Sequence, residues 1–320
     1  MTLPSPGSVD VSVVCAVYNE DQGVDRLVEG IAAVLPAVAA SHEIVIVDDG
    51  SSDDTLAKLK RCTHVLPTLR VVELTRNFGQ VGALGAGLTV ARGRYLVTMD
   101  GDLQHDPQDI PRLVLTAQQG HDLVATYRTV RVESVKRRIV TWVGNRVNFF
   151  FTGLDVRDFG STFRVLGARI VDALRDGTGR VHYNTPLLYA LARRPVQLPI
   201  TQHKRAFGST KWTFTMFVAY NLDFLTASLR LVHLILAVSF VAFAAATVLY
   251  LLKLLGVFAH VEAASAPAMI ALSALQLALL AVVWREVIQA QRFAKGVPPF
   301  VIHQIWSTGG AASDARPEAA

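Results

Sequence analysis

Two aspartates separated by one glycine are the residues of this chain best suited to chemistry. Asp100 and Asp102 belong to the run Asp100-Gly101-Asp102-Leu103-Gln104-His105, which directly follows the apolar residues 94–99. Mg²⁺ in proteins usually takes one or two carboxylates and completes its shell with water and substrate phosphates. A single Asp-X-Asp pair is weak evidence of a metal site, because aspartate is also common in turns and helix caps.

Two more polar loops follow apolar stretches and could share this site. Tyr18-Asn19-Glu20 follows residues 11–17, and a run of acids and serines from Asp48 to Asp54 follows residues 43–47. A simpler interpretation is open for both loops, since Tyr18 could lie at the edge of the core and Asp53 is expected to cap the next helix. The glycines between 79 and 87 lack the G-x-G-x-x-G spacing of a dinucleotide loop, so we expect them to allow close helix packing.

Positive charge is clustered in the second half of the chain. One group follows the last predicted strand and another flanks the turn Gly208-Ser209-Thr210; their members are Arg128, Arg131, Lys136, Arg205 and Lys211. Arginine and lysine around a flexible turn suit the binding of phosphates and other oxyanions. A solvated basic face or a surface for anionic lipid is the alternative. No nucleic acid partner is expected, because no recognition motif is present.

Alternating short apolar runs and helical stretches are the elements that must position these residues. Strands are predicted at residues 11–17, 43–47, 69–74, 94–99 and 122–126, and helices at about 21–38, 80–91 and 107–119. This alternation predicts an α/β fold whose parallel sheet is covered by helices on both faces. Ligands bind outside the carboxyl ends of such strands, so the polar loops should meet at one edge of the sheet.

The composition indicates that part of the chain enters a membrane. Of 320 residues, 51% are hydrophobic and 18% are charged, whereas an ordinary soluble domain has about 25% charged residues. The apolar excess lies in two uncharged runs, 231–252 and 263–284, each long enough to cross a bilayer as a helix. Flanking arginines and lysines place both ends of this hairpin in the cytosol. A pair of buried core helices is the alternative interpretation.

These motifs jointly resemble the family 2 glycosyltransferases of GT-A fold that act on polyprenyl phosphates, the dolichol-phosphate mannose synthase group. Within this group the chain resembles the undecaprenyl-phosphate aminoarabinose transferases and the bactoprenol glucosyltransferases. The resemblance covers residues 10–306 and is carried, in order, by Val17-Tyr18-Asn19-Glu20, Val47-Asp48-Asp49-Gly50-Ser51-Ser52-Asp53, Thr75-Arg76-Asn77-Phe78-Gly79, Met99-Asp100-Gly101-Asp102-Leu103-Gln104, Asp158-Phe159-Gly160-Ser161-Thr162-Phe163-Arg164 and Arg205-Ala206-Phe207-Gly208-Ser209-Thr210-Lys211.

The resemblance implies a role for each matching residue. Nucleotide-sugar contacts are implied for Ala16, Tyr18, Glu20, Asp49, Ser51, Arg76, Asp100, Gly101 and Gln104. Mg²⁺ or Mn²⁺ is implied at Asp100, Asp102 and Gln104, lipid-phosphate contacts at Arg128, Arg131, Lys136 and Ser209, and catalytic roles for Asp102, Arg205 and Lys211. One departure is Ala16, where relatives usually have proline, and this should affect loop rigidity more than chemistry.

The implied reaction moves one sugar from a nucleotide sugar, UDP-linked rather than GDP-linked, to an undecaprenyl-type phosphate with inversion at the anomeric carbon. A processive polysaccharide synthase is one alternative, but such enzymes carry Gln-x-x-Arg-Trp, and Gln202-His203-Lys204-Arg205-Ala206 lacks the tryptophan. A non-catalytic membrane scaffold that binds nucleotide sugar or anionic lipid is another. The resemblance leaves the oligomeric state open and is compatible with a homo-oligomer such as a tetramer.

Five segments are therefore expected in a protein of the inner or plasma membrane. Residues 1–9 form a flexible N-terminus without a signal peptide, and 10–228 form the cytosolic catalytic domain with amphipathic helices at about 134–152 and 211–229. A transmembrane hairpin spans 229–286, with helices at about 231–253 and 264–284. A cytosolic segment, 287–306, and a disordered tail, 307–320, complete the chain. The net charge of +5 suggests anionic partners, and two cysteines cannot form a disulfide framework.

Overall fold

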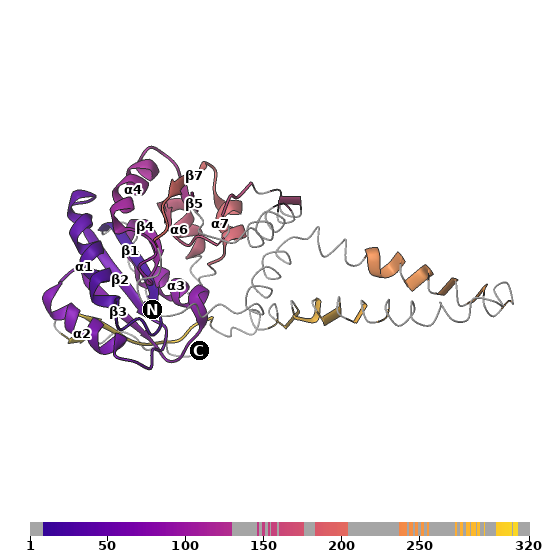
Figure 1. Ribbon diagram of the computed structural model, residues 1–320, viewed down its shortest axis with the longest axis horizontal. Coiled ribbons are helices and arrows are strands. Elements are labelled where there is room, and N and C mark those ends of the chain that lie inside the picture. Colours follow the sequence, from indigo (N-terminus) through magenta and orange to yellow (C-terminus); the bar gives the residue numbers. More distant parts are fainter. Residues whose placement is uncertain are drawn as a thin grey trace. The chain divides into compact units, whose positions relative to one another are not determined.

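The computed structural model describes residues 9–129, 146, 149–150, 153, 155–158, 160–175, 183–203, 299–308, 310–312 and short stretches between 237 and 291. The chain divides into two compact units, one made of Met1–Arg146, Leu154–Lys211 and Pro298–Ala320 and the other of Val147–Gly153 and Trp212–Val297. We call the first unit the sheet domain, and Figure 1 labels most of its strands and helices.

Strands and helices alternate along the sheet domain, as the sequence pattern predicts. Its strands are β1 Val9–Val17, β2 His42–Asp48, β3 Leu69–Leu74, β4 Gly93–Asp100, β5 Leu123–Arg128, β6 Arg164–Leu166, β7 Pro195–Ile200, β8 Ile302–Ser307 and β9 Gly310–Ala312. Its helices are α1 Val24–Val34, α2 Thr55–Val65, α3 Gly79–Val90, α4 Ile110–Gln118, α6 Ala168–Leu174 and α7 Thr185–Leu191, with 3₁₀ turns at Leu35–Ala37 and Pro107–Asp109.

The sheet is mixed, with a parallel centre. Its described strands lie in the order β7-β5-β6-β4-β1-β2-β3-β8-β9. β1 pairs in parallel with β2 and β4, β2 with β3, and β5 with β7, while β6 and β8 run antiparallel to their neighbours. The five strands expected from the sequence are confirmed to within two residues at each end, and the expected α/β fold class is confirmed for this domain.

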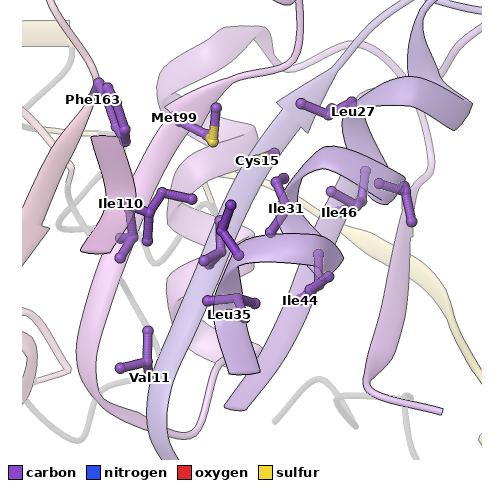
Figure 2. Close-up of a cluster of buried hydrophobic side chains, with 14 of the residues drawn as sticks. Val11, Cys15, Leu27, Ile31, Leu35, Ile44, Ile46, Met99, Ile110 and Phe163 are labelled. Atoms are coloured by element: carbon purple, nitrogen blue, oxygen red, sulfur yellow. The ribbon is translucent and has the colours of Figure 1, made fainter. Parts of the chain in front are cut away.

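Helices cover both faces of the sheet. Alternate residues of β1 point to opposite faces, and Val11 and Cys15 join a core that includes buried residues of α1 and α4. Figure 2 labels Leu27 and Ile31 of α1 and Ile110 of α4 in this core. α1 buries one helical stripe against this core, made of Val24, Leu27, Val28, Ile31 and Val34. On the other face, a Cβ added to Gly87 of α3 would collide with the side chain of Val14. The expectation that the glycines allow close helix packing is therefore confirmed at Gly87.

Two strands near the end of the chain extend the sheet beyond β3. β8 pairs antiparallel with β3, and Nε1 of Trp306 donates to Oε2 of Glu73 at 2.8 Å. The expected disorder from residue 307 onward is wrong at Ser307 and at Gly310–Ala312, which lie in β8 and β9. The sequence does not reveal these two strands because strand pairing uses backbone groups, which every residue type carries. A strand that pairs with the open edge of β3 therefore needs no particular hydropathy pattern.

The chain leaves the sheet and returns to it on the side where the parallel strands have their carboxyl ends, which we call the carboxyl edge. β7 runs parallel to the central strands and ends at the carboxyl edge. β8 begins at the carboxyl edge because it is antiparallel to β3. The backbone N–H of His203 donates to the carbonyl of Gln104 at 2.9 Å, and that of Thr75 donates to the carbonyl of Val301 at 3.1 Å.

The expected hairpin at 229–286 and the expected amphipathic helices lie for the most part outside the described residues. Among the helical residues that the structure does describe, no helix combines the length and the apolar character needed to span a membrane.

Candidate active site

The three polar loops meet at the carboxyl edge of the parallel strands, as the sequence predicted. The strand register places Asp100, at the end of β4, beside Ala16 of β1, and Ala16 beside Val47 of β2. The loops after β1, β2 and β4 are therefore neighbours, with the β1 loop in the middle. Ligands of open α/β sheets bind at this edge.

The loop from Asp100 to Gln104 is tightly constrained. A Cβ on Gly101 would collide with Val17 and come within 3.0 Å of the carbonyl oxygen of Ala16, so only glycine fits there without a shift. Oδ1 of Asp102 accepts from the backbone N–H of Gln104 at 3.1 Å. Leu103 has φ of 58°, a left-handed conformation that is costly for a bulky side chain and that clusters at functional sites.

Asp100 has polar neighbours on several sides, and 25% of its side chain is exposed. Its Oδ1 accepts from Oγ1 of Thr162 at 2.5 Å and also from Nε2 of Gln80. Its Oδ2 lies 3.9 Å from Nδ1 of the buried His105. Burial raises the pKa of the Asp100 carboxyl above its ordinary value and the charge of Asp102 acts in the same direction, opposed by His105, Thr162 and Gln80.

The β1 and β2 loops are cross-linked through Asn19. Its backbone N–H donates to Oγ of Ser51 at 2.9 Å, and its Oδ1 accepts from the backbone N–H of Ser52 at 2.8 Å. The next residue, Glu20, donates its N–H to Oγ1 of Thr55 at 2.9 Å. Asn19 itself has φ of 52°, a conformation that asparagine tolerates better than most residues. These bonds fix the half-buried Tyr18 and Glu20 beside the β2 loop.

Asp49 is directed toward the start of α3. Its two carboxylate oxygens accept from the backbone N–H groups of Phe78 at 2.7 Å and Gly79 at 2.9 Å, and only 3% of the residue is exposed. Burial raises the pKa of Asp49, although these two hydrogen bonds lower it. A carboxylate is favourable at a helix N-terminus, so the structure gives Asp49 a role in holding α3 that the sequence did not indicate.

The neighbouring Asp48 is also buried. Its Oδ2 accepts from the backbone N–H of Ser51 at 3.2 Å, while its Oδ1 has no hydrogen-bond partner within the described structure. Burial raises the pKa of the Asp48 carboxyl as well.

Two expected ligand contacts are engaged elsewhere. Oε1 of Gln104, expected at the metal, accepts from Nε2 of Gln202 at 2.8 Å. Arg128, expected at the lipid phosphate, forms a two-pronged ion pair with Asp158, with bonds of 2.5 Å from Nε and 2.8 Å from Nη2. Tertiary neighbours distant in sequence thus occupy both polar groups, which local sequence could not reveal.

The other expected contacts fall into two groups. The Arg76 guanidinium lies 4.4 Å from the centre of the Phe78 ring on an exposed loop at this edge. The remaining basic and polar candidates lie outside the described residues; they are Arg131, Lys136, Arg205, Ser209 and Lys211.

The chemistry of the Asp100–Asp102 loop fits a divalent cation. Within the described ranges, no group of three or more His, Cys, Asp or Glu side chains is arranged to hold a metal ion. A cation here would be coordinated by two carboxylates and would complete its shell with water and substrate phosphates, which is the usual coordination of Mg²⁺ in proteins. A nearby cation would also relieve the repulsion between these two acids.

Comparison with known proteins points to one family. Residues 12–174 match the model of Glycosyl transferase family 2. Undecaprenyl-phosphate 4-deoxy-4-formamido-L-arabinose transferase from Klebsiella pneumoniae is 34% identical over 229 residues, covering 70% of this chain and 69% of that protein. The protein of the same name from Proteus mirabilis is 33% identical over 251 residues, 77% of each chain. Dodecaprenyl-phosphate galacturonate synthase from Rhizobium johnstonii is 35% identical over 225 residues, 68% of this chain and 66% of that one.

Solved structures share the fold. Glucosyl-3-phosphoglycerate synthase from Mycobacterium tuberculosis, in complex with Mn²⁺, uridine diphosphate and phosphoglyceric acid, superposes with a TM-score of 0.50 at 18% identity and covers 67% of this chain and 75% of that one. Its complex with Mg²⁺ and uridine diphosphate gives a TM-score of 0.50, 18% identity and coverage of 67% and 76%. The GT-A-like architecture expected for the sheet domain is therefore confirmed.

Proposed function

Because this chain belongs to glycosyl transferase family 2 and is a glycosyltransferase, we propose that it transfers a single sugar from a nucleotide sugar to a polyprenyl phosphate. Two relatives that differ in the sugar they are named for, a formamido-arabinose and galacturonate, are both named for a polyprenyl-phosphate substrate. The polyprenyl phosphate is common to the names of both relatives, whereas the sugar differs. We therefore propose the lipid phosphate as a substrate of this chain and leave the sugar to the donor screen below.

The observation that carries the proposal is the placement of Asp100 and Asp102 beside the β1 and β2 loops at the carboxyl edge of a parallel sheet. A UDP-linked sugar would bind across this edge, with its nucleoside near Tyr18 and Glu20 and its diphosphate toward the two aspartates. Bound Mg²⁺ or Mn²⁺ supplies the charge neutralisation that a departing nucleoside diphosphate needs. Asp100 and Asp102 would hold the cation beside the diphosphate of the donor.

The acceptor is ready to react without a dedicated base. A phosphate monoester has a second pKa of about 6 and is mostly a dianion at pH 7. One of its oxygens can attack the anomeric carbon in a single displacement with inversion. Arg131, Lys136, Arg205, Ser209 and Lys211 would hold this phosphate and balance charge in the transition state.

We place the reaction at the cytosolic face of the membrane. Residues 231–253 and 264–284 would form the transmembrane hairpin, since both are apolar and basic residues flank them. The segment that holds the hairpin leaves the sheet after β7 and returns at β8, both at the edge that carries the site.

A donor screen tests the proposal. The full chain in detergent would be supplied with undecaprenyl phosphate, Mg²⁺ or Mn²⁺ and a panel of UDP- and GDP-sugars, and the lipid product would be weighed by mass spectrometry. One donor should yield a lipid heavier by one sugar, and chelation of the metal should stop the reaction. A polymeric product would favour a processive synthase instead, and no product from any donor would reject the proposal.

Two substitutions sharpen the screen. Asp102→Asn should lower kcat by about 10²–10³-fold, the cost of losing one electrostatic contact to the leaving group. Asp25→Asn, which alters an exposed carboxylate of α1, should leave the rate unchanged. Equal rates in the two variants would exclude the role given to Asp102.

A further inference from the structure

Two residues outside the acidic motif hold the Asp100 carboxylate. Oγ1 of Thr162 and Nε2 of Gln80 both donate to the same oxygen, Oδ1. They come from different parts of the fold, since Gln80 lies in the first turn of α3 and Thr162 directly precedes the strand β6.

The sheet register explains why Thr162 reaches Asp100. β4 and β6 pair antiparallel, with Thr98 opposite Arg164, so two further residues along this register bring Thr162 opposite Asp100. The Thr162 carbonyl accepts from Oγ1 of Thr98 at 2.6 Å, which holds the backbone at that position. Thr162 is therefore aimed at Asp100 by the strand pairing.

Gln80 is fixed from the other side of the site. Asp49 accepts from the backbone N–H groups of Phe78 and Gly79, the residues directly before Gln80. The same bonds that anchor the start of α3 therefore set the position from which Gln80 reaches Asp100. The two donors approach from elements whose positions are independently fixed.

The two bonds leave the carboxylate with inequivalent oxygens. Oδ1 takes both donors, and Oδ2 lies 3.9 Å from Nδ1 of His105, beyond hydrogen-bond distance. Rotation of the carboxylate would break both bonds to Oδ1. We propose that Thr162 and Gln80 are positioning residues that orient Asp100 so that Oδ2 is the oxygen presented to the divalent cation. This inference rests on the proposed function, because it concerns the same metal site.

The chain offers a matched control for the threonine. Thr126 of β5 is buried, and its Oγ1 lies 2.7 Å from Oγ of Ser161 and donates to the carbonyl of Phe163 at 2.8 Å. It thus anchors the same short segment as Thr162 without bonding to Asp100. Thr126→Val tests loss of a buried hydroxyl, whereas Thr162→Val tests loss of the hydroxyl that orients Asp100.

Binding of Mn²⁺ alone, without donor or acceptor, tests the inference. The full chain and its variants would be titrated with Mn²⁺, free ion would be measured by electron paramagnetic resonance, and thermal unfolding would be recorded in parallel. Thr162→Val and Gln80→Leu should each weaken Mn²⁺ binding about 10-fold or more, the usual effect of removing a partner of a metal ligand. Thr162→Ser should restore binding, and Thr126→Val should lower the melting temperature while leaving Mn²⁺ affinity unchanged.

Three results would overturn the inference: wild-type Mn²⁺ affinity in a folded Thr162→Val variant, equal weakening by Thr126→Val, or absence of Mn²⁺ binding to the wild-type chain. The proposed function fails separately. A chain that shows the expected affinities but glycosylates no polyprenyl phosphate would retain the positioning roles and lose the proposed acceptor.

Discussion

The ion pair between Arg128 and Asp158 leads to a prediction that separates a structural role for this arginine from the expected role at the lipid phosphate. The Asp158 side chain is 2% exposed and that of Arg128 is 21% exposed. Its two bonds, at 2.5 and 2.8 Å, satisfy both oxygens of the acid. The pair as a whole has no net charge, so it attracts a second anion only weakly.

The expected cost follows from burial. Removing one partner of a fully buried ion pair costs about 3–5 kcal/mol, because the other charge is left without compensation. Arg128 retains some exposure and can partly rehydrate, so Asp158→Ala should cost about 2–3 kcal/mol. At about 2–4 °C per kcal/mol for a domain of this size, the melting temperature should fall by roughly 4–12 °C.

Thermal unfolding and steady-state kinetics together check this prediction. Asp158→Ala, Arg128→Met and the double variant form a cycle whose coupling energy reports the pair. Asp109→Asn is the matched control, since it alters an exposed Asp–Arg pair at 2.8 Å that is expected to contribute less than about 1 kcal/mol. KM for undecaprenyl phosphate should stay within about threefold of wild type for Arg128→Met, because the pair does not bind the acceptor. A large rise in KM with an unchanged melting temperature would refute this reasoning and return Arg128 to the lipid phosphate.

Three further outcomes are expected. Gly87→Ala should destabilise the sheet domain by about 1–3 kcal/mol in denaturant unfolding, because the added methyl group collides with the sheet, and wild-type stability would contradict the packing. Trp306→Phe should cost about 1–2 kcal/mol by losing the bond to Glu73, and an unchanged unfolding midpoint would argue against β8 docking. Although burial raises the pKa of Asp122, its hydrogen bonds to Arg169 and to two backbone N–H groups lower it overall. The stability that Asp122 contributes should be present above the ordinary carboxyl pKa and lost as pH falls below that value. Between about pH 5 and pH 2, the melting temperature of Asp122→Asn should therefore change less with pH than that of the wild type.

Local pattern was enough to predict the parallel centre of the fold. β3 ends at the predicted residues, because a buried parallel strand is a continuous apolar run bounded by polar turns. β6 has only three residues, Arg164–Leu166, which is too short for any periodicity. β8 follows β3 by more than two hundred residues, and its position depends on an open sheet edge that no local signal describes.

The sequence predicts which loops form the candidate site, but it does not predict the individual side-chain contacts within it. Asp100 and Asp102 follow a strand, so their edge of the sheet could be deduced. The partners of Gln104 and Arg128 lie 98 and 30 residues away along the chain, and the pairing depends on tertiary packing. Thr162 lies in a motif that the sequence shows, but its contact with Asp100 depends on the register of β6 against β4.

The return of the chain at β8 bears on how a soluble fragment of this enzyme could be made. Truncation after His203 would remove β8 and leave β3 as an exposed hydrophobic edge, which invites aggregation. A fragment that keeps residues 299–312 needs a linker in place of residues 204–298. β7 and β8 are seven strand spacings apart, roughly 34 Å at about 4.8 Å each, so a flexible glycine-serine linker would need on the order of 40 residues. Both ends of that linker would leave from the edge that carries Asp100, so its path should be routed away from the donor and acceptor.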